Sequence, residues 1–435
     1  MDHLQAYEHV VRLAGESGPR LAATPAARAA EQQLTRSFDE LGLQLDRHEF
    51  RQPSYRSPES ALRVLIDGAW TELEHQPVWF AGDTGPTPVR GEIVAIGTGA
   101  EGYVRGIDPA GKVLLISRDS YIDYPDDLLY RRLLEWRPAA VLFTTNAGAH
   151  APLDTFFDWE KSEHAPPPPA AVIHYRDAAR LIHAGATEAE LLCRFEVEEG
   201  SCANILATLP GTDPEAGAVI VAAHYDTAPT GAGAIDNAGG SAMVLCLAQW
   251  LAAEAAAGRR RRRAVKFVIY SGHETGLHGP RALVRDRPEL LEETVFALNF
   301  DVVGAPIHLN AIYGVAAPSV IDAVRAQVDE LGFDWPVAAA VVPYDTWSLS
   351  GGGVPWINLG QGMTNWLHTD ADTVDRVHPE AFRAPLAFSR AVLDWATEAE
   401  TVEQGYPEAL TASVRAYSEF SGWELTWPGD DDAEA

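Results

Sequence analysis

The chain has 435 residues, 46% of them hydrophobic, and a formal net charge of −29 at neutral pH. This length exceeds what one hydrophobic core usually supports, so we expect more than one domain. The negative charge argues against function through nonspecific binding to nucleic acid or to an anionic membrane, because both attract positively charged surfaces. We therefore expect neither nucleic acid nor membrane as a partner.

The beginning of the sequence and the cysteines indicate the compartment. Residues 1–8 have no basic start and no apolar segment of signal-peptide length, and no later apolar run could span a bilayer. The three cysteines, Cys193, Cys202 and Cys246, lack metal-ligand spacing, and an odd number argues against a disulfide framework. We expect a cytoplasmic protein with reduced, mostly buried thiols. The sequence leaves open whether the chain forms a homo-oligomer.

Residues 1–56 are expected to supply amino-terminal helices to a catalytic domain. Two helices are predicted between Leu4 and Gly42, and Pro25 and Gly42 stand at the two ends of the second.

Residues 57–195 are expected to form an inserted, smaller β-rich domain, because short apolar runs there alternate with Gly and Pro. The ionisable residues of this segment form no compact ligand set, so we expect it to contribute shape rather than chemistry. The predicted strands are 89–97, 111–118, 139–146 and 170–173.

Residues 196–402 are predicted to be an α/β catalytic domain with a mixed, largely parallel sheet flanked by helices. Apolar runs of strand length alternate there with longer helical stretches. The predicted strands are 218–223, 265–270, 295–300 and 355–359, and a helix is expected from Asp236 towards Ala257.

Two charged segments invite other interpretations. Five consecutive arginines, 259–263, follow Gly258; such runs occur in nucleic-acid binding segments, but the position after a helix favours a solvated loop that compensates the helix end. Residues 403–435 are expected to hold one helix, 407–420, and a disordered acidic tail at 430–432.

Five side chains near strand ends could bind a divalent cation. They are His224, Asp236, Glu274, Asp301 and His368. Imidazole and carboxylate groups bind such ions when several converge, and open α/β sheets hold ligands beyond the carboxyl ends of their strands. Singly, each has an ordinary explanation, because a buried His is often a hydrogen-bonded core residue and an Asp often caps a helix.

Together with their neighbours, these residues resemble the M28 family of metallopeptidases, the zinc aminopeptidase-like hydrolases, across most of residues 1–400. Residues 57–195 are also similar, more loosely, to a protease-associated domain. The matching segments are His224-Tyr-Asp, Gly233-Ala-Ile-Asp-Asn-Ala-Gly-Gly, Glu274-Thr-Gly-Leu-His-Gly, Asn299-Phe-Asp-Val-Val-Gly and His368-Thr-Asp-Ala-Asp-Thr.

The resemblance implies two zinc ions and a role for each ligand. Asp236 would bridge the ions, His224 and Asp301 would complete one site, and Glu274 and His368 the other. Asp226 would accept a hydrogen bond from His224 and orient its ring. Two such ions share a water molecule and polarise a carbonyl group, which implies metal-assisted amide hydrolysis.

His273 departs from the family pattern, in which a second Glu precedes the metal-binding Glu and acts as general base. Three alternatives follow. His273 takes over as the base, since an imidazole can shuttle protons near neutral pH; or the site binds metal without hydrolysing peptides; or the substrate or reaction is a different one.

A second departure lies at Tyr344-Asp-Thr, where the family commonly has Ser-Asp-His. Asp345 is retained and Thr346 replaces the His. Tyr344 could donate a hydrogen bond to a developing oxyanion, or be an ordinary loop residue. Three tryptophans nearby, at 347, 356 and 366, could line an apolar substrate site or be buried packing residues.

The leading hypothesis is a binuclear zinc hydrolase that cleaves an amide bond in a peptide or small peptide-like substrate. The alternatives are a non-peptidase amidohydrolase acting on a specialised small molecule and a catalytically silent metal-binding protein. The sequence does not identify the substrate, the need for a free amino terminus, or the native metal, since Co, Mn and Zn accept similar ligands.

Overall fold

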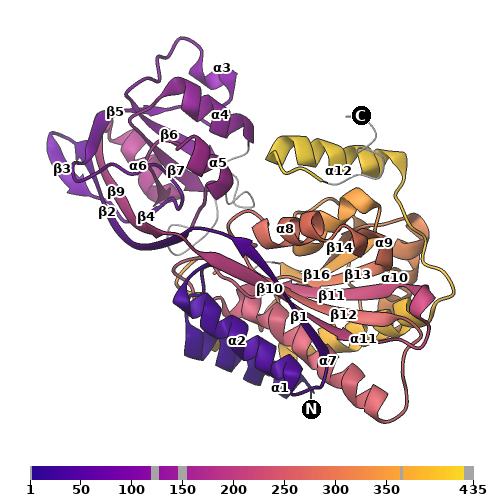
Figure 1. Cartoon of the computed structure of the whole chain (residues 1–435). Coiled ribbons are helices and arrows are strands. Elements are labelled where there is room, and N and C mark those ends of the chain that lie inside the picture. Colours follow the sequence, from indigo (N-terminus) through magenta and orange to yellow (C-terminus); the bar gives the residue numbers. More distant parts are fainter. Residues whose placement is uncertain (1, 119–126, 146–153, 363–365, 426–435) are drawn as a thin grey trace.

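The structure is a computed structural model that describes residues 2–118, 127–145, 154–362 and 366–425. The acidic residues 430–432 and the predicted strand end at Asn146 lie outside this described part. Two eight-stranded sheets form the framework, one in each of the two bodies seen in Figure 1.

The first sheet has a parallel centre, because β11 pairs in parallel with β12 and β13, and β13 pairs in parallel with β16. Antiparallel strands flank this centre on both sides. The predicted mixed, largely parallel sheet is therefore confirmed. In spatial order the strands are β1 (Gln44–Arg51), β10 (Ser201–Leu209), β12 (Ala264–Tyr270), β11 (Ala218–His224), β13 (Thr294–Phe300), β16 (Trp356–Gly362), β14 (Leu309–Val315) and β15 (Val337–Ala339).

Helices cover both faces of this sheet, which explains why its central strands are apolar throughout. In β11, Val219 and Val221 face one hydrophobic cluster, while Ile220 and Ala222 face another. The first cluster includes α1 (Asp2–Val10), α2 (Pro25–Asp39), α7 (Gly240–Ala256), α10 (Pro318–Glu330) and α11 (Arg383–Glu398). The second includes α8 (His278–Asp286), α9 (Glu289–Glu293) and α12 (Glu408–Ser421).

The second sheet lies between β1 and β10 in the sequence and carries helices of its own. Parallel pairing joins β5, β6, β7 and β8. Its order is β3 (Ala69–Glu72), β2 (Ser54–Ile66), β9 (Glu188–Glu198), β5 (Val89–Ala95), β6 (Val113–Arg118), β7 (Ala140–Thr145), β8 (Ala170–His174) and β4 (His75–Pro77). The helices are α3 (Glu101–Val104), α4 (Asp127–Trp136), α5 (Trp159–His164) and α6 (Tyr175–His183), so this body is more helical than the β-rich expectation.

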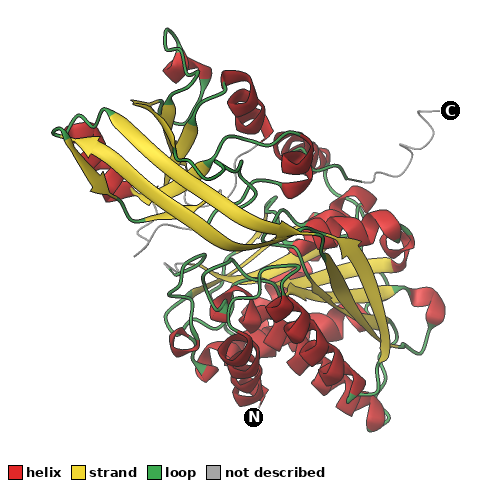
Figure 2. Cartoon of the chain, turned by 60° about the vertical axis from the view of Figure 1, so that its left-hand side comes forward, coloured by secondary structure: helices red, strands yellow, loops and turns green. Residues whose placement is uncertain are grey.

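Two long paired strands connect the sheets, as Figure 2 shows. β1 continues into β2 after Pro53, and β9 continues into β10 after Gly200. β1 pairs with β10, and β2 pairs with β9. At the junction the backbone N–H of Gln52 donates to the carbonyl of Gly200 at 3.1 Å, and a Cβ on Gly200 would lie only 2.6 Å from the Gln52 oxygen. The pairing therefore runs from one sheet to the other.

The arginine loop, residues 259–263, joins α7 to β12, and only its first part is the solvated loop that we predicted, because Arg259 and Arg260 are exposed and Arg263 is buried. Arg263 is 3% exposed. It donates to the carbonyls of Ala396, Ala399 and Glu400 at 3.0, 2.6 and 3.3 Å, so it caps the carboxyl end of α11 rather than that of α7.

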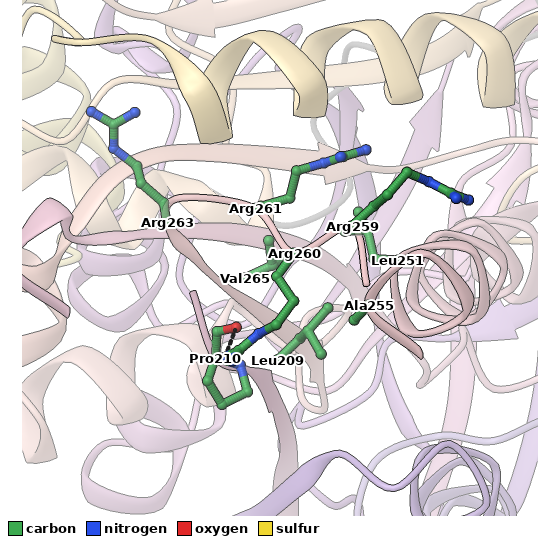
Figure 3. Close-up of a pocket in the computed structure, with 9 residues that line it drawn as sticks. All are labelled: Leu209, Pro210, Leu251, Ala255, Arg259, Arg260, Arg261, Arg263 and Val265. Carbon is green, nitrogen blue, oxygen red and sulfur yellow. Dashed lines mark hydrogen bonds between the residues drawn. The ribbon is translucent and has the colours of Figure 1, made fainter. Parts of the chain in front are cut away.

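The other arginines of the loop are also partnered. Arg259 pairs with Glu254, Arg261 with Asp394 and Arg262 with Asp213. Figure 3 shows Arg260 reaching the carbonyl of Pro210, at 3.1 Å, while its labelled neighbours point elsewhere. Nucleic-acid binding is not favoured, because the protein itself occupies these guanidinium groups.

Two further expectations, on the cysteines and on the amino-terminal helices, are met. Cys193, Cys202 and Cys246 are buried and free. Two amino-terminal helices are present, and Thr24 caps the second by accepting from the Ala27 N–H at 3.2 Å. In the described residues no helix is both long enough and apolar enough to cross a bilayer.

Candidate metal centre

The five predicted ligands come together at one edge of the first sheet. His224 is the last residue of β11, and Asp301 directly follows β13. Glu274 lies four residues beyond β12, Asp236 lies in the turn η3 (Ala234–Gly239) before α7, and His368 follows β16. Because β11, β12, β13 and β16 run in parallel, their carboxyl ends meet at this edge. We call these five residues the metal rim.

Asp236 lies at the middle of the metal rim, between the two histidines. Its Oδ1 is 3.3 Å from Nε2 of His224, and its Oδ2 is 3.4 Å from Nε2 of His368. Nε2 of His224 also lies 3.4 Å from Oδ1 of Asp301, and Nε2 of His368 lies 3.0 Å from Oε2 of Glu274. Two groups of donor atoms therefore share one carboxylate.

The metal rim is buried and has more negative than positive charge. Its three carboxylates belong to side chains no more than 8% exposed. Burial raises the pKa of Glu274, with Asp236 adding to the effect. Nε2 of His224 is buried and has no hydrogen-bond partner in the described part of the chain.

These properties test whether the residues present fit a divalent cation. A surplus of buried carboxylate charge is costly without a cation to neutralise it. Imidazole nitrogens and carboxylate oxygens are the ligands of catalytic zinc sites. The donor set therefore fits zinc.

Asp226 supports the metal rim differently from the expectation. Nδ1 of His224 lies 3.1 Å from the peptide carbonyl of Asp226 and 3.6 Å from its carboxylate. The carboxylate instead accepts the backbone N–H groups of His273 and Glu274, both at 3.3 Å. Asp226 thus orients the loop after β12 with its side chain and His224 with its carbonyl group.

Two buried charged residues, which the sequence did not indicate, hold the turn that carries Asp236. Asp372 accepts the N–H groups of Ile235 and Asp236 at 2.8 and 3.0 Å. Arg20 is fully buried and donates to the carbonyls of Ala232 and Gly233 at 2.6 and 3.1 Å. Sequence reasoning missed both because their partners lie more than 130 positions away.

The inserted segment also reaches the metal rim, through Asp154. The N–H of Asp154 donates to the carbonyl of His368 at 2.8 Å, and its carboxylate accepts from the N–H and hydroxyl of Thr230 at 3.0 and 2.6 Å. Burial raises the pKa of Asp154 to about 6, although the Thr230 donors act in the opposite direction. The expectation that residues 57–195 contribute only shape is therefore incomplete.

His273, the predicted base, stands beside the metal rim. Its ring stacks on that of His224, with centroids 3.9 Å apart and planes inclined by 8°. Nε2 lies 3.6 Å from Oδ2 of Asp301, and Nδ1 lies 2.9 Å from Oδ1 of Asp345. Burial and His224 lower the pKa of His273, but the Asp345 and Asp301 carboxylates outweigh them and raise it to about 9.

Tyr344 and the tryptophans occupy different environments. Trp347 and Trp356 are fully buried and belong to the hydrophobic cluster beneath α12, so the packing alternative holds for both. Trp366 is partly exposed, with the Arg376 guanidinium 5.3 Å from its ring centroid. Burial raises the pKa of Tyr344, and the Asp301 carboxylate adds to this shift.

A second group of potential ligand residues lies outside the metal rim. His278 stands between Asp158 and Glu160, at 3.7 and 3.5 Å. Arg281 lies 3.7 Å from the former carboxylate and 3.4 Å from the latter. Because this guanidinium already supplies the counter-charge, the group is better described as an ion-pair network between α5 and α8.

Comparison with known proteins shows similarity to a peptidase family over the segment that holds the metal rim. Residues 204–393 match the sequence model of Peptidase family M28. The match covers 190 of the 435 residues, so the similarity to this family is shown for part of the chain. All five residues of the metal rim lie inside the matched segment.

Relatives and solved structures extend the similarity over most of the chain. Aminopeptidase YwaD of Bacillus subtilis is 24% identical over 399 residues, 86% of this chain and 80% of that protein. A peptidase M28 precursor from Shewanella amazonensis has a TM-score of 0.78 at 20% identity, covering 93% of this chain and 95% of its own. The zinc aminopeptidase BSAP from Bacillus subtilis has a TM-score of 0.75 at 20% identity, covering 93% and 98%.

The fold of the chain is that of these structures. The chain is a metal-dependent hydrolase, as predicted.

Proposed function

We propose that the chain is a binuclear zinc hydrolase of aminopeptidase type, which cleaves an amide bond in a peptide or small peptide-like substrate. One observation carries the proposal: the two oxygens of Asp236 face different histidines, Nε2 of His224 at 3.3 Å and Nε2 of His368 at 3.4 Å. A carboxylate between two donor groups is suited to bridge two ions.

The remaining ligands divide naturally between the two ions. We assign His224 and Asp301 to one ion and Glu274 and His368 to the other, following their pairing at 3.4 and 3.0 Å. Bound there, zinc would lower the pKa of a water molecule and polarise the amide carbonyl of the substrate.

His273 could be a sixth ligand or the general base, and its ring geometry favours the base. An ion lies near the plane of each imidazole that binds it. The His224 and His273 planes are nearly parallel and stacked at 3.9 Å, so they do not converge on one ion. We therefore assign His273 to proton transfer, a role that typically contributes about 10²–10⁴-fold to the rate.

In this mechanism Nε2 of His273 takes one proton from the attacking water molecule and delivers it to the leaving nitrogen. The raised pKa of about 9 describes His273 beside bare carboxylates. Cations in the metal rim would lower that pKa towards neutrality, because nearby positive charge disfavours the imidazolium. A base with a near-neutral pKa is suited to both halves of the transfer.

Tyr344 is proposed as a hydrogen-bond donor to the carbonyl oxygen as negative charge develops on it. Its pKa is raised chiefly by burial, so the hydroxyl keeps its proton at neutral pH and remains a donor.

The domain roles are part of the same proposal. Residues 1–56 and 196–402 would form the catalytic domain, residues 57–195 a protease-associated-like domain, and residues 403–435 a carboxyl-terminal extension. The contact from Asp154 to His368 supports a wall of the substrate site formed by the inserted domain. A cytoplasmic location stays a prediction.

Metal content and amide hydrolysis test the proposal together. The purified chain should hold about two zinc ions, and Asp236→Asn should lose both, whereas Asp322→Asn, on the exposed side of α10, should keep them. Hydrolysis of aminoacyl p-nitroanilides should stop with a chelator and return with zinc. Less than one ion in the unaltered chain would overturn the metal assignment.

The same assay separates the alternative functions. Zinc-loaded protein that cleaves no aminoacyl substrate but hydrolyses another amide would indicate the specialised amidohydrolase. Zinc-loaded protein that is inactive on all amides tested would indicate the silent binding protein.

A further inference from the structure

His273, which departs from the family pattern, meets the retained Asp345 in space. They lie 72 positions apart in the sequence, yet Nδ1 of His273 is 2.9 Å from Oδ1 of Asp345. Asp345 opens the helical turn η4 (Asp345–Gly352), whereas His273 lies in the loop after β12. The contact therefore joins two elements at the edge of the metal rim.

Burial and hydrogen bonds to neighbouring residues fix the position of Asp345 and its carboxylate. It is completely buried. The Ser348 hydroxyl donates to its carbonyl at 3.0 Å. The side-chain nitrogen of Asn299, in the amide orientation that satisfies its neighbours, donates to Oδ2 at 3.3 Å. A buried carboxylate with one oxygen turned to Asn299 needs a donor for the other oxygen.

The chemistry of the two groups fixes where the proton sits. An ionised carboxylate only accepts hydrogen bonds, so Nδ1 of His273 must carry a proton to bond Asp345. In a neutral imidazole the other nitrogen is then an acceptor. That nitrogen, Nε2, is the one on the side of Asp301, at 3.6 Å. Stacking on His224 fixes the ring plane as well.

We propose that Asp345 is a positioning residue that holds His273 in its Nδ1–H form, with Nε2 as an acceptor towards the metal rim. The inference rests on the proposed function, in which Nε2 of His273 accepts the proton of the attacking water molecule.

Nitrogen-15 NMR of the zinc-loaded protein, labelled in its histidine rings, tests which nitrogen of the neutral His273 ring carries the proton. The His273 signals are identified by their absence in His273→Ala, and the spectrum is recorded above the pH at which the ring loses its second proton. We expect the remaining proton on Nδ1 and none on Nε2. A neutral ring with its proton on Nε2 overturns the proposal, and this reading needs neither catalytic activity nor a variant at position 345.

Asp345→Asn supplies the second test, since an amide can also donate and so permits the other tautomer. We expect the Nε2–H form to appear in the spectrum, with kcat reduced about 10²–10⁴-fold, KM changed less than about threefold, and zinc content retained. In a His273→Ala background the same change should cost little further, because residues that act as one unit are not additive.

The outcomes distinguish this inference from the proposed function. An unchanged His273 tautomer in Asp345→Asn, or an equal loss of kcat with and without His273, would reduce Asp345 to a structural residue and overturn the inference. A correct tautomer in a protein without amidase activity would keep the inference about Asp345 while refuting the proposed function. Asp322→Asn is the matched control and should leave spectrum and kcat unchanged.

Discussion

Two clusters of charge stand out in this protein, and they differ in how the charge is neutralised. In the arginine loop each guanidinium has a carboxylate or carbonyl partner from the chain itself. In the metal rim three carboxylates surround two imidazoles, and Nε2 of His224 has no hydrogen-bond partner in the described residues. The comparison teaches that a long run of charge can be purely structural, whereas buried carboxylates that outnumber the imidazoles beside them indicate a bound cation.

Removing zinc should give the largest difference between the two clusters, because it should destabilise the fold through the metal rim and not through the arginine loop. With free zinc at 1,000 times its dissociation constant, each bound ion should stabilise the fold by about 4 kcal/mol. Denaturant unfolding with and without chelator measures this difference. Asp236→Asn should abolish it, and Arg263→Met should leave it intact. Equal stability of zinc-loaded and zinc-free protein would break the comparison.

Replacing the proposed base should affect the rate but not the metal. His273→Ala should lower kcat by about 10²–10⁴-fold, equivalent to roughly 3–5 kcal/mol, while zinc content stays at the unaltered level. Steady-state kinetics with an aminoacyl p-nitroanilide measures it, and His164→Ala, an exposed residue of α5, is the control. An undiminished kcat in His273→Ala would exclude the base.

Truncating a buried arginine should affect stability but not metal binding. Arg263→Met leaves the carbonyls of Ala396, Ala399 and Glu400 without their donor, so the free energy of unfolding should fall by about 2–4 kcal/mol. Urea unfolding measures the loss. Arg259→Met, at the exposed end of the same loop, should produce no measurable change, because exposed ion pairs contribute little. Similar losses in both variants would contradict the distinction drawn within the loop.

Replacing Asp154, which joins the inserted segment to the metal rim, should have the smallest effect. It should be visible in the pH dependence of the free energy of unfolding of the zinc-free protein. The folded-state pKa of Asp154, about 6, lies above the ordinary value of 3.8, so the folded state binds more protons between these pH values. The free energy of unfolding should therefore fall as the pH rises from 4 to 6. Asp154→Asn should make this decrease in the free energy of unfolding smaller by about 1–3 kcal/mol. The same decrease in the variant and the unaltered protein would contradict the prediction.

The sequence predicted the central sheet and the residues that meet at its edge because both leave local signals. Strands such as β11 are continuously apolar, and His224 and Asp301 stand where such runs stop. The strands that connect the two sheets have no such signal. Most residues of β1 are exposed and apolar residues alternate only weakly along it, so the strand forms because it pairs with β10.

The supporting residues of the site could not be predicted from the sequence, for a different reason. Arg20 and Asp372 act through backbone groups more than 130 positions away, and no local pattern indicates such partners. Asp345 was noticed only as a retained residue; its contact with His273 depends on how η4 packs against the loop after β12.

The strand pairs that cross between the sheets have a mechanical consequence. The two strand pairs cross from one sheet to the other, so swinging the inserted body outward would break backbone hydrogen bonds on both sides of Gln52 and Gly200. We therefore expect the inserted body to stay at a fixed distance from the metal rim, and the two sheets to move as one unit.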